Sequence, residues 1–149
     1  CKLKVVGKGP KENELKDFVC KSNMQNVEFL GYKQGEELTS LVSGAYFVIV
    51  PSEWYENNPM TIIEAYSVGT PVLGARIGGI PEIIIEDENG YQFESANIND
   101  LKEKIIKVDS LPVEKYEALS WGTLVFANKY LNPENYYLEL MAFYKQFLK

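Results

Sequence analysis

Short runs of apolar residues alternate with amphipathic segments along most of this chain of 149 residues. Alternation of this kind is typical of βα units, in which parallel strands are connected by helices that cover the sheet. The expected strands span 3–6, 27–30, 45–50, 70–75 and 90–94, and the expected helices span 12–22, 36–44, 59–68, a segment from 99 onward, 119–130 and 133–148, with 81–86 a short helix or an extended piece. The sequence therefore predicts an α/β fold, a Rossmann-like doubly wound parallel sheet with helices on both faces that ends in C-terminal helices.

The run 45–50 is apolar on both faces, so we expect it to be a central strand beneath helices. The helix after it should begin with Asn58 as its N-cap and Pro59 at its first position, and Gly69 should close its far end. Aromatic residues of the last helices are interpreted as core or domain-interface packing; they are Phe126, Tyr136, Tyr137, Phe143, Tyr144 and Phe147.

Composition excludes several classes of function. A net charge of −6 argues against nucleic acid as a partner. The chain has no histidine, which excludes a Ser–His or Cys–His catalytic pair and a His-ligated zinc site supplied by this chain alone. Cys1 and Cys20 lack a metal-type spacing and are expected to be free thiols in a reducing cytoplasm. No apolar run approaches the roughly 20 residues that a membrane-spanning helix needs. We therefore expect a single cytoplasmic domain, 1–149, without a metal.

The loops that follow the expected strands are the place to look for a ligand site, because ligands of doubly wound sheets bind at the carboxyl ends of the strands. The amides of Met60 and Thr61 would be unpaired at a helix start there and would attract an anion such as a diphosphate. Glu56 lies in the same loop and Glu64 lies inside the helix. A carboxylate can accept hydrogen bonds from the two hydroxyls of a ribose. From the spacing alone, a salt-bridged or merely exposed Glu64 is an equally good interpretation.

The two glutamates are separated by seven residues and stand among five further motifs that occur in a fixed order. These motifs are Val6-Gly7-Lys8-Gly9-Pro10, Val27-Glu28-Phe29-Leu30-Gly31, Pro51-Ser52, Gly69-Thr70-Pro71-Val72 and Gly78-Gly79-Ile80-Pro81-Glu82. Together they resemble the retaining glycosyltransferases of the GT-B fold, often called group 1. The resemblance extends from Leu3 to the final helix. Many members of that family carry Gly-Phe-Gly after the first glutamate, where this chain has Asn57-Asn58-Pro59. The resemblance therefore does not extend to the detailed phosphate contacts of this segment.

The resemblance implies a role for each residue that matches a family motif. Glu64 would bind the nucleotide ribose, and Glu56 would lie beside the transferred sugar and hydrogen-bond its hydroxyls as the candidate catalytic residue. The other expected donor contacts come from loop residues: amides of Asn58, Met60 and Thr61 at the diphosphate or sugar, Gly31 and Tyr32 at the base, Gly7 and Gly9 near the donor, and Gly78 and Gly79 on the opposite wall. Taken singly, each glycine is better explained as a turn former. Tyr32 is more simply explained as a half-exposed loop aromatic. Arg76 and Lys8 could reach phosphates, but they are more simply explained as surface charges.

The implied activity is transfer of a hexose from a UDP- or GDP-linked donor to a glycan or lipid-linked acceptor with retention, in polysaccharide or surface-glycan biosynthesis. No cofactor besides the donor and no metal is expected, because a helix N-terminus and basic groups can neutralise the leaving diphosphate. The resemblance also implies a domain truncated at its N-terminal side, which lacks its first strand–helix unit and the acceptor-binding domain, and which is inactive alone. The longer protein could associate peripherally with a membrane. Two alternatives stay open: a sugar-nucleotide epimerase of the same fold, and a non-catalytic nucleotide-binding or interaction module.

Overall fold

The computed structural model describes residues 2–147 and divides the chain into two compact units, residues 1–40 and residues 41–149. Each unit has its own parallel sheet, and helix α2 (Gly35–Ser43) crosses the boundary between them. Within the described part of the chain, no helix has the length and apolar character required to cross a membrane.

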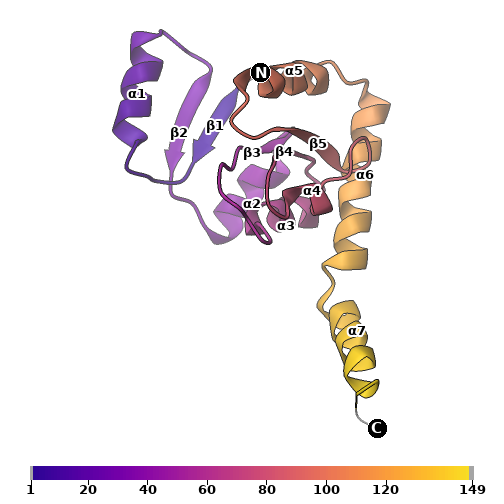
Figure 1. Ribbon diagram of the computed structural model, residues 1–149. Helices are drawn as coiled ribbons and strands as arrows, with labels where there is room; N and C mark the ends of the chain where they lie inside the picture. Colours follow the sequence, from indigo (N-terminus) through magenta and orange to yellow (C-terminus); the bar gives the residue numbers. More distant parts are fainter. Residues whose placement is uncertain (1, 148–149) are drawn as a thin grey trace. The chain divides into compact units, whose positions relative to one another are not determined.

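The first unit is a small βαβ unit formed by β1 (Leu3–Val6), α1 (Glu12–Lys21) and β2 (Val27–Gly31) (Figure 1). β1 and β2 pair in parallel, with Leu3 opposite Val27 at the start of the ladder. None of the described residues 2–40 is fully buried. The predicted strands and helix are therefore present, but they enclose no buried core of their own.

The second unit has a sheet of three parallel strands, in the order β3 (Val48–Val50), β4 (Val72–Arg76) and β5 (Gly90–Glu94). Its other helices are α3 (Met60–Ser67), α4 (Ile80–Ile83), α5 (Ile98–Asp109), α6 (Val113–Tyr130) and α7 (Pro133–Lys145). Because the strands run in the same direction, their carboxyl ends meet at one edge of the sheet.

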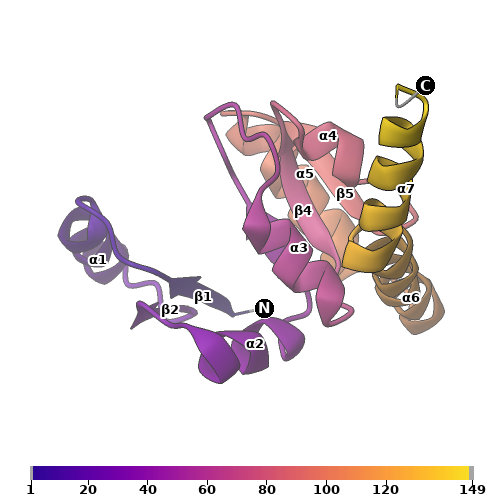
Figure 2. The same cartoon turned by 90° about the horizontal axis from the view of Figure 1, so that it is seen from below.

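The core of the second unit lies on both faces of β4, since successive strand residues point to opposite faces. Val72 belongs to a buried cluster with side chains of α3 and α4. Leu73 and Ala75 belong to a second cluster, which includes Val108 of α5 and Leu119 of α6. Figures 1 and 2 show helices on either side of this strand. The predicted α/β fold, with parallel strands alternating with helices and with long helices at the C-terminal end, is confirmed.

The position of β3 corrects one prediction. The apolar run 45–50 was expected to be a central strand, but the strand covers only Val48–Val50 and lies at the edge of its sheet, next to β4. An apolar run indicates that both faces of a strand are covered, and it carries no information about whether both edges are paired. The central strand of this sheet is β4, whose residues Val72–Ala75 are all buried.

The start of α3 corrects another prediction. Its N-cap is Pro59 rather than Asn58, and no side chain caps the helix. The far end behaves as predicted: Gly69 has a φ of 80°, its amide donates to the Tyr66 carbonyl, and the amide of Thr70 donates to the Ala65 carbonyl. This is the hydrogen-bond pattern of a Schellman motif, which favours glycine at the left-handed position.

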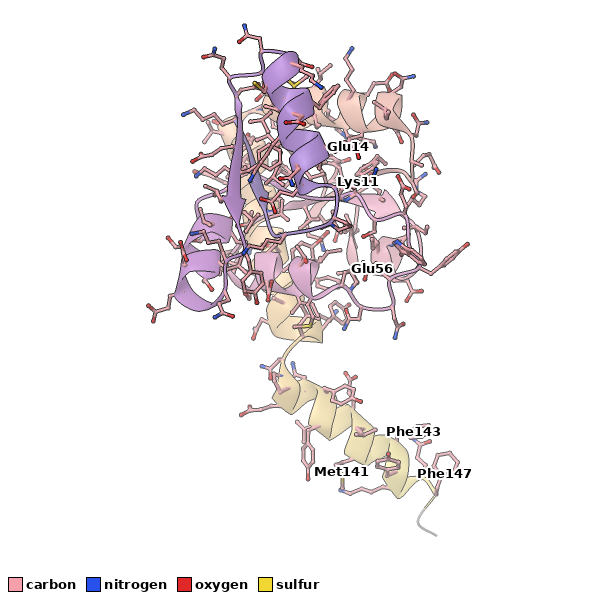
Figure 3. All side chains as sticks on the ribbon, turned by 90° about the vertical axis from the view of Figure 1, so that its left-hand side faces the viewer. Lys11, Glu14, Glu56, Met141, Phe143 and Phe147 are labelled. Atoms are coloured by element: carbon pink, nitrogen blue, oxygen red, sulfur yellow. The ribbon has the colours of Figure 1, made fainter. Side chains whose placement is uncertain are left out.

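The aromatic residues of the last helices divide into two groups. Phe126 of α6 packs edge-on against buried Tyr66, with 5.7 Å between ring centroids. The five aromatics of the final segment are instead at least half exposed: Tyr136 (65%), Tyr137 (60%), Phe143 (54%), Tyr144 (51%) and Phe147 (70%). Figure 3 shows Met141, Phe143 and Phe147 along this segment. The prediction of core packing is therefore wrong for these five, and packing at a domain interface stays a prediction.

Two predictions concern residues at the ends of the chain. Residue 148, the expected end of the last helix, and Cys1 lie outside the described residues. Cys20 is a free, exposed thiol, as predicted.

Candidate functional site

The candidate site is the loop 51–59, which joins β3 to α3 and carries Glu56. The loop begins at the carboxyl end of β3 and ends at buried Pro59. Its backbone turns tightly at Glu56, whose amide donates to the carbonyl of Trp54 at 2.8 Å. The carbonyl of Glu56 accepts a hydrogen bond from the amide of Gly79 at 2.7 Å. The segment that follows β4 therefore holds the loop that follows β3.

Gly78 and Gly79 lie directly against the backbone of this loop. A Cβ atom at Gly78 would be 2.4 Å from the Glu56 carbonyl oxygen, and one at Gly79 would be 2.2 Å from the Asn57 carbonyl oxygen. Gly78 also has a φ of 57°, which disfavours any other residue. These glycines were expected on the opposite wall of the donor site. The structure brings them into contact with Glu56 itself, and a wall contact with the donor stays a prediction.

The side chain of Glu56 is half-buried and oriented by a serine of its own loop. Ser52 Oγ donates a hydrogen bond to Glu56 Oε1 at 3.1 Å. Ser95, just after β5, donates through its Oγ to the carbonyl oxygen of Ser52 at 3.0 Å. Figure 3 labels Glu56 in its place on the loop. Sequence reasoning missed Ser95, although its position at the end of a parallel strand was a signal that it belongs to this edge.

Two large aromatic side chains of the loop were also missed by sequence reasoning. Trp54 is 83% exposed and Tyr55 is 87% exposed, and they immediately precede Glu56. Exposed aromatics on a loop whose backbone is held by hydrogen bonds are a common feature of binding surfaces.

The start of α3 presents backbone donors beside the loop. The amides of Ile62 and Ile63 both donate to the carbonyl of Pro59. The amides of Met60 and Thr61 precede this first helical bond and have no intrahelical partner. The side chains of both residues are exposed, as is that of Asn58. Attraction of an anion by these amides stays a prediction.

Glu64 lies one helical turn after Met60, on the same side of α3. Its side chain is exposed, and no ion pair among residues 2–147 involves it. Of the interpretations left open for Glu64, the salt-bridged one is not observed in the described part of the chain. The exposed carboxylate is compatible both with ribose binding and with a merely exposed side chain, so ribose binding stays a prediction.

The remaining predicted residues belong to the first unit. The amide of Gly7 donates to the carbonyl of Gly31 at 2.7 Å, and these glycines have φ values of 130° and 68°. Gly9 has open space around its Cα. Tyr32 is 62% exposed and its hydroxyl donates to Gln34. Gly7 and Gly31 are thus brought together at the carboxyl ends of β1 and β2.

Arg76, at the end of β4, already has protein partners. Its Nη1 lies 2.5 Å from Glu94 Oε1, and its Nε donates to Gln92 Oε1 at 3.3 Å. This arrangement favours the interpretation of Arg76 as a surface charge over that of a phosphate ligand. Among the described residues, no group of three or more His, Cys, Asp or Glu side chains could hold a metal ion.

Comparison with known proteins gives a consistent family match. The family described as "Glycosyl transferases group 1" matches residues 1–122. An uncharacterised glycosyltransferase of Methanocaldococcus jannaschii is 37% identical over 106 residues, which cover 71% of this chain and 30% of that protein. The sulfoquinovosyl transferase of Arabidopsis thaliana is 34% identical over 110 residues, covering 74% of this chain and 21% of that protein. The chain therefore spans less than a third of the length of these two relatives.

Solved structures match the fold over nearly the whole chain. The sucrose-phosphate synthase of Thermosynechococcus elongatus superposes with a TM-score of 0.82 at 26% identity, covering 98% of this chain and 38% of that one. The Anabaena protein HepE, solved in complex with UDP-glucose, superposes with a TM-score of 0.74 at 22% identity, covering 85% of this chain and 36% of that one. At this identity the second match concerns the fold alone.

Proposed function

Because this chain belongs to the group 1 glycosyl transferase family, we propose that it binds a nucleotide-diphospho-sugar at the loop before α3. The protein transfers a hexose from a UDP- or GDP-linked donor, with retention at the anomeric carbon. Its acceptor is a glycan or a lipid-linked saccharide, and its pathway is polysaccharide or surface-glycan synthesis.

The observation that carries this proposal is the placement of Glu56 at the carboxyl edge of the sheet, on a loop held by Gly79 and followed directly by the start of α3. A sugar that contacts Glu56 would have its diphosphate near the amides of Met60 and Thr61, where the helix dipole favours negative charge. Glu64, one turn further along α3, would accept hydrogen bonds from the ribose hydroxyls.

Catalysis in this proposal consists of positioning the donor and stabilising the leaving diphosphate, with Glu56 contacting the sugar hydroxyls. The helix amides supply the stabilisation, so no divalent cation is needed. The acceptor site lies outside this chain, in the further part that a protein as long as the relatives would contain. We therefore propose that this chain binds the donor but does not catalyse transfer by itself.

Calorimetric titration of the chain with UDP, GDP and ADP tests the proposal. We expect UDP or GDP to bind, with UDP as the first choice because a protein of the same fold was solved with UDP-glucose. Glu64→Ala should weaken nucleotide binding at least tenfold, because hydrogen bonds to a charged group contribute about 1.5–3 kcal/mol. Glu103→Ala, which removes an exposed glutamate of α5, is the matched control and should leave the affinity unchanged.

Three outcomes would contradict parts of the proposal. Absence of any nucleotide binding would favour the interaction module. Loss of binding in the presence of EDTA would exclude the metal-independent mechanism. Interconversion of a UDP-sugar without transfer, followed by NMR in a protein of the relatives' length that contains this chain, would favour the epimerase.

A further inference from the structure

We propose that Ser52 is a positioning residue that orients the carboxylate of Glu56 toward the donor sugar, and that Ser95 holds Ser52 in place. The inference rests on the proposed function, because it takes Glu56 as the residue that contacts the sugar. It adds two serines to which the sequence motifs assign no role.

The hydrogen bond from Ser52 Oγ to Glu56 Oε1, at 3.1 Å, connects two half-buried side chains across the turn of the loop. A free glutamate side chain loses rotamer entropy when a ligand immobilises it. A carboxylate already held by a hydroxyl has lost part of that freedom before the donor arrives. A carboxylate accepts hydrogen bonds at both oxygens, so Oε2 of Glu56 stays available for a sugar hydroxyl.

Ser95 connects this arrangement to the sheet. Its hydroxyl donates to the Ser52 carbonyl at 3.0 Å, and the two residues are 43 positions apart in the sequence. Ser52 follows β3 and Ser95 follows β5, and these strands flank β4 without pairing with each other. The bond therefore spans the end of β4 and fixes the loop to the far side of the sheet. The Gly79 amide holds the same loop at the Glu56 carbonyl, so the loop is fixed on both sides of its turn.

A positioning role for Ser52 predicts different effects on the binding of a nucleotide sugar and of the bare nucleotide. Glu56 would contact only the sugar, so loss of its orientation should weaken binding of a nucleotide sugar and leave binding of the bare nucleotide intact. A merely structural role for Ser52, in which its loss loosens the whole loop and the start of α3, would weaken both ligands together.

The experiment measures the affinity of the chain for UDP and UDP-glucose, and for GDP and GDP-mannose, by calorimetry. The variants are Ser52→Ala, Ser52→Thr, Ser95→Ala, Glu56→Ala and the double variant Ser52→Ala/Glu56→Ala. For whichever pair binds, we expect Ser52→Ala to weaken the nucleotide sugar about fivefold to tenfold and the bare nucleotide less than twofold. Ser52→Thr keeps the hydroxyl and should restore affinity to within about twofold, and Ser95→Ala should cause a smaller loss of the same kind.

The double variant decides whether Ser52 acts through Glu56. If it does, Ser52→Ala has no further effect once Glu56 is alanine. Equal effects of Ser52→Ala in both backgrounds, or equal weakening of nucleotide and nucleotide sugar, would overturn the positioning role while leaving the proposed function intact. An unchanged nucleotide-sugar affinity in Glu56→Ala, or no binding of either nucleotide, would instead overturn the assigned role of Glu56 and this inference with it.

Discussion

Replacement of Gly79 by alanine should displace the loop that carries Glu56. The added Cβ would lie 2.2 Å from the carbonyl oxygen of Asn57 and 3.3 Å from that of Glu56. A carbon and an oxygen that are not bonded need a separation of more than about 3 Å, so the loop must retreat by about 1 Å. Gly79 has φ −82° and ψ −5°, which alanine adopts without strain. The steric contact is thus the main effect of the substitution.

The magnitude follows from two effects of the same displacement. A retreat of about 1 Å would break the hydrogen bond from the Gly79 amide to the Glu56 carbonyl, now 2.7 Å long. Loss of this bond costs about 0.5–1.5 kcal/mol, and overpacking costs about 1–3 kcal/mol. We expect Gly79→Ala to lower the free energy of unfolding by about 2–4 kcal/mol and to weaken binding of a nucleotide sugar.

Urea denaturation, with calorimetric titration of UDP-glucose on the same samples, checks both effects. Gly9→Ala is the control for the substitution itself, because no atom lies within 4 Å of its added Cβ. The free energy of unfolding of this variant should stay within about 1 kcal/mol of the parent chain. If Gly79→Ala unfolds at the same urea concentration as the parent and binds UDP-glucose equally well, the close backbone contact described above is wrong.

Three further predictions concern stability. Tyr66→Phe should leave the free energy of unfolding unchanged or raise it by up to about 1 kcal/mol, because the buried hydroxyl has no hydrogen-bond partner among the described residues. Burial raises the pKa of Tyr66, so the tyrosine ionises at lower pH in the unfolded chain than in the folded one. Above about pH 10 the free energy of unfolding of the parent should therefore fall with pH, by about 1.4 kcal/mol per pH unit more than that of Tyr66→Phe. Urea titrations at several pH values measure this difference. Asn97→Ala should lower the free energy of unfolding by about 1 kcal/mol, because the Asn97 side chain accepts hydrogen bonds from two amides in the first turn of α5. The hydrogen bond from Tyr91, with the nearby lysines, lowers the pKa of Asp87. The ionised Asp87 therefore stabilises the fold above the unfolded pKa of about 3.9, and this stabilisation is lost as pH falls through the folded pKa. In Asp87→Asn, the free energy of unfolding should fall less steeply with decreasing pH than in the parent.

Much of the fold could be predicted because it depends on local patterns. The strand Gly90–Glu94 has the predicted bounds, and Gly69 closes α3 as its sequence position suggests. The edge position of β3 could not be predicted, because it depends on which strands pair and not on the residues of β3. The exposure of the aromatics of α7 (Pro133–Lys145) could not be predicted either. An apolar helix face indicates that something covers it, but it does not identify the partner.

The candidate site divides in the same way. The position of Glu56 after a strand and that of Glu64 within a helix follow from the order of elements. The bonds that fix the backbone of the Glu56 loop do not, because they come from Gly79 and Ser95, which follow two other strands. Sequence could indicate that all three loops reach one edge of a sheet, but the pairing of particular atoms across it depends on tertiary structure.

The two glutamates are thus positioned by different physical means, and this difference has a functional consequence. Glu64 is placed by the hydrogen bonds of α3, which are local and persist as long as the helix does. Glu56 is placed by tertiary contacts from the ends of β4 and β5, so small changes in those segments would move it while Glu64 stays in position. If Glu64 binds the nucleotide and Glu56 the sugar, sugar selectivity can change through residues distant in sequence without loss of nucleotide affinity. Substitutions at Ser95 and Gly79 should therefore change the ratio of nucleotide-sugar to nucleotide affinity, whereas substitutions that weaken α3 should lower both together.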